Sequence, residues 1–184
     1  MFKISFFSNY LSHHQIPFSL ELNKMSGIEY TFVSTIPMDD ERIHMGWKIE
    51  DEFAFELKAY ESDENLEKAK QLAIDSDVVI IGSAPDEFII PRLKQYKLTF
   101  RYSERPYKDG INIRNFIRIL GGTWLHHGRF QNKPLYMLCA SSYTASDFYK
   151  MGCYKNKCYR WGYFPEVKEY DIQKLMESKS DIEI

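Results

Sequence analysis

Long apolar runs are missing from this chain. None of its 184 residues belongs to an uninterrupted apolar stretch of about 18, so the sequence predicts no membrane-spanning helix. The apolar start, Met1–Phe7, is too short for a secretory signal and turns polar at Ser8. A strong charge is missing too. The net charge of −2 lacks the basic surplus typical of nucleic-acid-binding proteins, so we expect no nucleic-acid partner.

Cysteine is scarce. The three cysteines, Cys139, Cys153 and Cys158, cannot all pair within one chain, and their spacing matches neither a disulfide framework nor a zinc knuckle. We therefore expect a reducing, cytoplasmic setting in which these residues pack in the core. For Cys139 the small core residue is favoured over a nucleophile.

Two common nucleotide-binding signatures are also absent. The first predicted strand is followed by Ser8–His14, which holds no glycine fingerprint, and no phosphate-binding P-loop occurs in the chain. This argues against nicotinamide enzymes, flavin enzymes and P-loop NTPases. We expect no cofactor and no metal.

What the sequence does contain is an alternation of apolar strands with helical segments. The least ambiguous strand is Asp77–Gly82, a nearly continuous branched run typical of a strand covered on both faces. Further strands are expected at Lys3–Phe7, Tyr30–Thr35, Phe53–Tyr60, Lys97–Tyr102, Leu135–Cys139 and Cys158–Trp161, with helices at Gln15–Met25, Glu64–Ile74 and Asp86–Gln95 and after Ser142. This order predicts one Rossmann-like α/β domain with a mostly parallel sheet and helices on both faces.

The stretch Leu135–Tyr170 is the most informative. It reads as a buried strand, Ser142-Tyr143-Thr144, a helix closed by Gly152, a short strand, and a Gly-Tyr-Phe-Pro exit. This order resembles the end of the first domain of the retaining glycosyltransferases with two Rossmann domains (GT-B type), the large family numbered four. The resemblance implies an N-terminal, acceptor-side domain at 1–167, followed at 168–184 by a linker and the start of a truncated second domain. Ile182–Ile184 looks like a strand cut short.

The resemblance also implies an activity. The whole enzyme would transfer a sugar from a nucleotide-diphosphate sugar to an acceptor hydroxyl, in bacterial polysaccharide or glycoconjugate assembly. In that family the donor is held mainly by the second domain, through a Glu-x₇-Glu pattern that this chain has no domain to place. The implied partners are thus the missing C-terminal donor-binding domain and a sugar or glycolipid acceptor. The chain alone is expected to be inactive.

Candidate site residues follow from the rule that ligands bind beyond the carboxyl ends of parallel strands. After the first strand, Asn9, His13 and His14 could face a cleft and hydrogen-bond sugar hydroxyls or a phosphate; alternatively, one histidine caps the helix and the other is solvated. After Asp77–Gly82, Ser83 could lie beside a bound hydroxyl or anion, or serve as an ordinary helix cap. Ser142 is placed near the cleft by the resemblance, as a helix cap.

The segment Arg101–Arg105 gathers charge just past a strand. Glu104 occupies, by position, the place where the resembled family carries a group facing the reaction centre, so it is the candidate catalytic residue. Arg101, Ser103 and Arg105 are cleft-binding candidates, because a guanidinium suits phosphate or sugar oxygens. The alternative is a surface cluster of ion pairs.

A basic, aromatic stretch runs from Asn112 to Lys133. Arg114 and Arg118 lie four residues apart, on one helical face, and Trp124, His126, His127 and Arg129 follow. In relatives of the resembled family a corresponding region meets the inner face of the membrane, which makes a peripheral membrane contact one interpretation. A plain amphipathic helix packed on the sheet explains the same pattern and is favoured.

Two other functions remain open at this point. One is a free-standing Rossmann-like module that binds a small ligand without chemistry. The other is half of a sugar-nucleotide epimerase, which shares the paired Rossmann-like plan. The polar loop Asp39–Trp47 could reach an acceptor site, but nothing in its residues distinguishes it from a surface loop.

Overall fold

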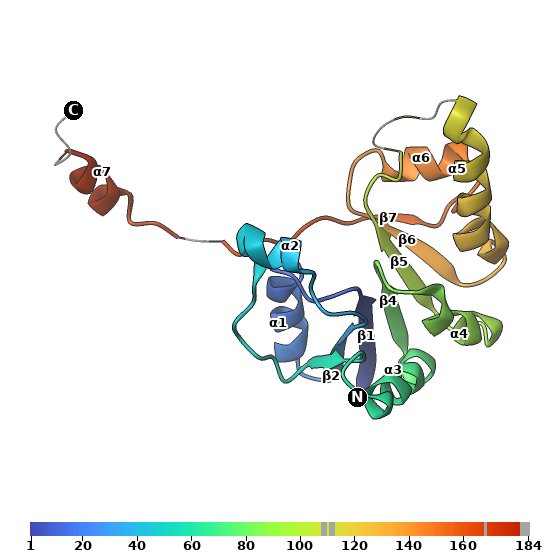
Figure 1. The fold of residues 1–184 in the computed structure, drawn as a ribbon, viewed down its shortest axis with the longest axis horizontal. Helices are drawn as coiled ribbons and strands as arrows, with labels where there is room; N and C mark the ends of the chain where they lie inside the picture. Colours follow the sequence, from blue (N-terminus) through green and yellow to red (C-terminus); the bar gives the residue numbers. More distant parts are fainter. Residues whose placement is uncertain (108–109, 111–112, 168, 181–184) are drawn as a thin grey trace.

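Seven parallel strands form one sheet in the order β3-β2-β1-β4-β5-β6-β7 (Figure 1). The computed structural model describes residues 1–107, 110, 113–167 and 169–180. The strands are β1 Phe2–Ser8, β2 Ile28–Ser34, β3 Glu56–Lys58, β4 Val78–Ile81, β5 Thr99–Ser103, β6 Leu135–Cys139 and β7 Cys158–Arg160. The predicted α/β class is confirmed, and the sheet is parallel throughout.

Helices cover both faces of this sheet, because consecutive strand residues point to opposite sides. Phe7 joins a buried cluster with side chains from α3, α4 and α6. Its neighbour Phe6 joins a second cluster that includes side chains from α1. The helices are α1 Ile16–Lys24, α2 Asp40–Arg42, α3 Asp63–Asp75, α4 Ile90–Lys94, α5 Ile113–His126, α6 Thr144–Lys150 and α7 Ile172–Ser180.

Most expected elements are present within a few residues of their predicted bounds, and two differ. The strand expected over Phe53–Tyr60 is only Glu56–Lys58. The helix expected over Asp86–Gln95 is a 3-10 turn, Asp86–Phe88, followed by α4. Pro91 lies in the first turn of α4, where its missing N–H costs nothing, so it begins a new helix rather than continuing the turn.

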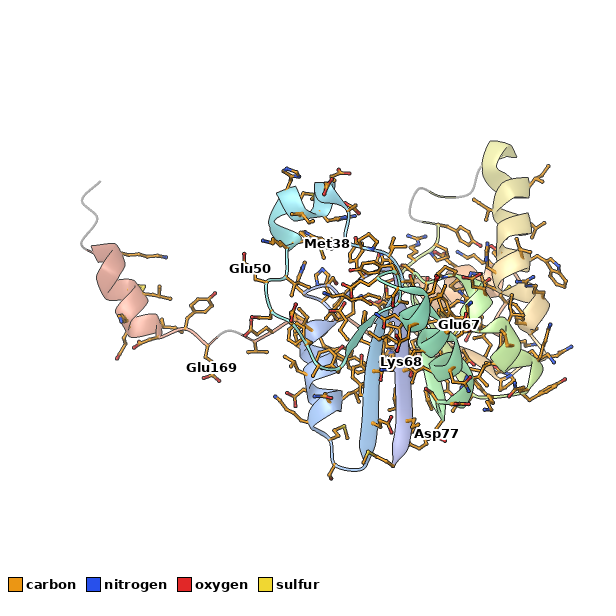
Figure 2. The ribbon with its side chains drawn as sticks, turned by 60° about the horizontal axis from the view of Figure 1, so that its bottom comes forward. Met38, Glu50, Glu67, Lys68, Asp77 and Glu169 are labelled. Carbon is orange, nitrogen blue, oxygen red and sulfur yellow. The ribbon has the colours of Figure 1, made fainter. Side chains whose placement is uncertain are left out.

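The amino-terminal edge of the sheet is held by a buried arginine. Arg92 is fully buried, and its guanidinium donates to the carbonyl oxygens of Ala73, Ser76, Asp77 and Leu98 and to the Thr99 hydroxyl, at 2.5–3.3 Å. These acceptors come from the end of α3 and the starts of β4 and β5. At the same edge Lys3 N–H donates to the Asp77 carboxylate at 2.7 Å. Figure 2 shows Asp77 there, at the far end of the sheet from Met38.

After β7 the chain crosses back over the carboxyl ends of the strands. Trp161 and Phe164 pack on Phe18 of α1, with ring centroids 5.2 and 5.7 Å away, and Tyr163 reaches His14 at 5.0 Å. An extended segment containing Glu169 then leads away from the sheet to α7 (Figures 1 and 2). A linker was expected over 168–180, and residues 172–180 of it are helical. The domain boundary at residue 167 stays a prediction, and the predicted strand at Ile182–Ile184 lies outside the described residues.

Candidate functional site

A cleft of about 920 Å³ opens at the carboxyl ends of β1, β4 and β5. The chain runs outward from β1 to β2 and β3 and then returns to β4 on the other side, so the strand order switches between β1 and β4. Ligands of open parallel sheets bind at such a switch point. The cleft is lined from three directions by Ser8, Asn9, Tyr10, Ser12, His14, Gln15, Arg42, Trp47, Gly82, Ser83, Arg101, Tyr102, Ser103, Glu104, Arg105, Pro106, Tyr107, Ile119, Gly122, Thr123, His126, His127, Phe148 and Tyr163.

Gly82 forms the floor between β1 and β4. Its N–H donates to the carbonyl of Phe7 at 2.8 Å, which holds the two strand ends together. A Cβ at this position would lie 3.3 Å from Ser8 Oγ and 3.6 Å from a ring carbon of Tyr102, so glycine lets three strands approach closely. Ser83 follows in the cleft wall and is exposed. It does not cap a helix, because the next turn is preceded by Pro85.

The loop after β1 contributes Asn9 and His14, and it directs His13 elsewhere. His13 is absent from the cleft lining and packs against the rings of His14 and Trp47, with centroids 3.9 and 4.7 Å apart. Burial, and then the neighbouring charge of His14, lower the pKa of His13. Neither histidine caps α1, whose preceding residue is Gln15. Of the two histidines, only His14 is in position to meet a ligand in the cleft.

The end of β5 supplies the charged wall of the cleft. Arg101, Ser103, Glu104 and Arg105, four of the candidates from the sequence, all line it. Ser103 Oγ donates to the carbonyl of Glu104 at 2.8 Å and so fixes the local turn. Glu104 is partly exposed, and a carboxylate in such a cleft can act as a general base or acid. The alternative of a mere surface cluster fits less well, since Arg101 is buried.

Two carboxylates with little exposed surface, a partly buried one and a buried one, lie behind the arginines. Asp86 accepts from Arg101 Nη2 at 2.6 Å and bonds His126 Nδ1 at 2.8 Å. Burial alone would raise the pKa of Asp86, but Arg101 and His126 lower it more, so the pKa falls below its usual value. Asp147 of α6 accepts from Arg105 Nε at 2.8 Å.

His127 lies deeper than His126 and is electrically neutral. Its Nδ1 forms a 2.8 Å hydrogen bond with the Tyr154 hydroxyl, and its ring packs on Phe148. Burial, followed by the charge of Arg101, lowers the pKa of His127 to about 3. The neutral imidazole lines the cleft on one side and packs against core side chains on the other, and it adds no positive charge to the cleft.

Sequence reasoning missed several residues of the cleft and its support. Arg42 and Trp47 line it, from the loop Asp39–Trp47 for which the sequence left a cleft position and a plain surface loop both open; the Arg42 guanidinium is 4.5 Å from the Trp47 ring. Tyr163 lines it from the exit segment. Asp86 and Asp147 carry no local signal, because each becomes significant only through an arginine that lies distant in sequence.

Ser142 lies outside the cleft. It is exposed and lines a separate depression at the ends of β6 and β7, together with Cys139, Cys158 and Arg160. It does not cap α6; instead, Ser141 Oγ pairs with Thr144 Oγ1 at 3.0 Å. The physical reason is that β6 lies beyond β5, on the side away from the strand-order switch. All three cysteines are free, and Cys139 and Cys153 are buried, as expected of packing residues.

Other predictions can be located only in part. Among the described residues, no group of three or more His, Cys, Asp or Glu is placed to hold a metal. None of the helices in the described part of the chain combines the length and apolarity needed to cross a bilayer. On α5, Ile117 and Trp124 are exposed. The side chains of Arg114 and Arg118 lie outside the described residues, so the predicted basic face, and the peripheral membrane contact with it, stays a prediction.

Comparison with known proteins gives likenesses in structure only. No family model matches the sequence, and no curated protein matches it either. Among solved structures, 96% of this chain superposes on 52% of MnaA of S. aureus in its co-structure with UDP, with a TM-score of 0.54 and 10% identity. In a second comparison, 94% of this chain superposes on 54% of a structure of UDP-N-acetylglucosamine 2-epimerase, with a TM-score of 0.51 and 10% identity. The chain therefore has the fold of a Rossmann-like half of these structures and spans about half their length.

Proposed function

We propose that this chain is one half of a sugar-nucleotide-processing enzyme, and that the whole protein is an epimerase acting on a UDP-sugar. The observation that supports this most is the structural likeness. Nearly all of the chain superposes on about half of an enzyme of that kind and on about half of a protein solved with UDP. The candidate cleft lies at the edge of the sheet where such folds bind ligands.

In this proposal Glu104 is the acid–base residue. Without a redox cofactor, the hydrogen at C2 leaves as a proton, and its electron pair forms a C1–C2 double bond as the C1–O bond to UDP breaks. Return of UDP to C1 and of a proton to the opposite face of C2 gives the epimer, so a proton-accepting group is needed beside the sugar. Glu104 is the only carboxylate residue among the described cleft lining. The remaining half, beyond the predicted boundary at residue 167, would close over the sugar nucleotide. No cofactor is invoked.

A glycosyltransferase is the second candidate, and one observation favours it. The segment 161–164 crosses back over the strand ends onto α1, in the place where the resembled family leads its chain into a donor-binding domain. In this version the cleft holds the acceptor sugar, and Glu104 orients its hydroxyl. The donor's leaving phosphate can take the proton, which would make Glu104 helpful rather than obligatory.

One experiment separates the two candidates. The full-length gene product is incubated with UDP-N-acetylglucosamine in D₂O, with and without sugar acceptors, and the products are followed by NMR. An epimerase forms the C2 epimer, with deuterium at C2, without any acceptor. A glycosyltransferase releases UDP only when an acceptor is present. If a panel of UDP-sugars gives neither result, the proposal is wrong.

Substitutions then test the proposed acid–base role of Glu104. Glu104→Gln should lower epimerase turnover by a factor on the order of 10²–10⁴, the usual contribution of acid–base catalysis. Glu87→Gln is the matched control, because Glu87 is exposed and lies outside the cleft lining. Equal loss in both variants would remove Glu104 from the mechanism.

A further inference from the structure

Two arginines of the cleft wall are each hydrogen-bonded to a carboxylate that lies outside the lining, a partly buried one for Arg101 and a buried one for Arg105. Arg101 is held by Asp86 and Arg105 by Asp147, and the two carboxylate side chains are 11% and 3% exposed. Neither carboxylate lines the cleft, whereas both arginines do. A ligand in the cleft therefore meets the guanidinium groups first.

The contacts of Arg105 with the described residues hold it on one edge. Its Nε donates to Asp147 Oδ2 at 2.8 Å, and its guanidinium carbon lies 5.1 Å from the centre of the Tyr143 ring. The structure gives no other hydrogen bond from Arg105 to any described residue. A guanidinium carries five N–H donors, and those of the two terminal nitrogens suit the paired oxygens of a phosphate group.

Arg101 has spare hydrogen-bonding capacity as well. It is 7% exposed, its Nη2 donates to Asp86, and its guanidinium also forms a hydrogen bond with the Tyr154 hydroxyl. Its Nε is buried and has no hydrogen-bond partner among the described residues. A buried donor without a partner costs free energy, so such atoms commonly mark a place where a ligand or water completes the structure. Among the described residues of the lining, Arg42 adds a third arginine, and Glu104 is the single carboxylate.

We infer that Arg105 and Arg101 form an anion site for the phosphate groups of the sugar nucleotide, and that Asp147 is the positioning residue that orients Arg105. The identity of the ligand rests on the proposed function. The new element is that this half of the enzyme binds phosphate by itself. The buried Asp147 lies on α6, whereas Arg105 follows β5, so the pair fixes the end of β5 against α6.

The test is isothermal titration of the 184-residue chain with inorganic pyrophosphate, UDP and glucuronate. The expected result is one pyrophosphate site per chain that Arg105→Gln weakens at least tenfold. Arg105→Lys should recover part of the loss, because it restores charge but not the paired donors. Asp147→Asn should weaken binding about threefold or more while Arg105 is still present. Arg160→Gln is the matched control, because Arg160 is exposed and lies outside the cleft lining. This variant should bind pyrophosphate as tightly as the unaltered chain does.

Several results would overturn the inference. They are no pyrophosphate binding by the unaltered chain, equal losses in Arg105→Gln and Arg160→Gln, or tighter binding of glucuronate than of pyrophosphate. Circular dichroism of each variant shows whether it is folded. If Asp147→Asn does not fold, the comparison of Arg105→Gln with Arg105→Lys still tests the site. Failure of the anion site and failure of the proposed function give different results. If the chain binds pyrophosphate but the full-length protein has neither epimerase nor transferase activity, only the proposed function is wrong. If the full-length protein is active but the chain does not bind pyrophosphate, only the anion site is wrong.

Discussion

The two edges of the sheet use arginine in opposite ways. At the amino-terminal edge, Arg92 is fully buried, and each of its three guanidinium nitrogens donates to protein oxygens. At the carboxyl-terminal edge, Arg105 is partly exposed and has one hydrogen bond to a described residue, while Arg101 keeps a buried Nε without a partner among them. Burial lowers the pKa of Arg92 to about 10, and it still remains charged at neutral pH.

The difference separates a structural residue from a binding one. An arginine whose donors are all used by the backbone fastens elements together and has nothing left for a ligand. An arginine held on one edge by a carboxylate has a fixed direction and free donors, which is the arrangement that recognition of an anion requires. By this criterion the amino-terminal edge stabilises the fold, and the carboxyl-terminal edge carries the function. The predictions below test that division.

The largest effect is expected at the amino-terminal edge. Arg92→Met should lower the free energy of unfolding by about 3–5 kcal/mol, because it leaves several buried carbonyl groups without their donors. Urea unfolding measures the loss. Pyrophosphate affinity of the folded variant should not change. A loss of affinity larger than threefold would show that the two edges are not separate.

Acid should destabilise the chain through His127. Its pKa is about 3 when folded and 6.5 as a free histidine, so between these values the unfolded chain binds a proton that the folded chain does not. The free energy of unfolding therefore falls as the pH drops below 6.5, by about 2–3 kcal/mol at pH 4.5. His127→Gln should flatten this slope in urea unfolding at several pH values. His44→Gln, which alters an exposed histidine, is the control and should keep the slope. An unchanged slope in His127→Gln would contradict the assignment.

A smaller effect is expected on the floor of the cleft. Gly82→Ala places a methyl group 3.3 Å from Ser8 Oγ, so the Ser8 side chain at the end of β1 must shift by a few tenths of an ångström. The free energy of unfolding should fall by about 1 kcal/mol, and UDP should bind more weakly. Thermal unfolding and titration measure the two effects. Gly162→Ala has open space around its Cβ and should leave both unchanged.

The smallest effect should come from Ser142. Ser142→Ala alters an exposed side chain in a separate depression, so stability should stay within about 0.5 kcal/mol and pyrophosphate affinity should not change. The same titration checks it. Lost affinity in this variant would extend the binding region past β5 to β6.

The sequence predicted the fold well because the strands are locally distinct. A continuous branched run such as Val78–Ile81 has few alternatives to a doubly covered strand, and Gly27 and Gly152, both with positive φ, mark the turns after α1 and α6. The short β3 was over-predicted because Phe53 and Phe55, apolar like strand residues, pack in the core from a loop.

The site was only partly predictable. Asn9, His14, Ser83 and Arg101–Arg105 follow strands, so the parallel topology alone places them at one edge. Asp147 could not be found that way, because its importance depends on its contact with Arg105. The topology left the loop ending at Trp47 as an open candidate, and only its contacts with His13 and Arg42 single out Trp47. Ser142 was placed near the cleft by the family resemblance, whereas its position depends on how far β6 lies from the strand-order switch.

The most direct test of the central claim is to map UDP binding on the ¹⁵N-labelled chain by NMR. The amides of Asn9, Gly82 and Ser103–Arg105 should shift on titration with UDP, while those of Gly27 and Leu98, at the amino-terminal edge, should not. Shifts confined to the amino-terminal edge, or no shifts at saturating UDP, would contradict the assignment of the carboxyl-terminal cleft as the sugar-nucleotide site.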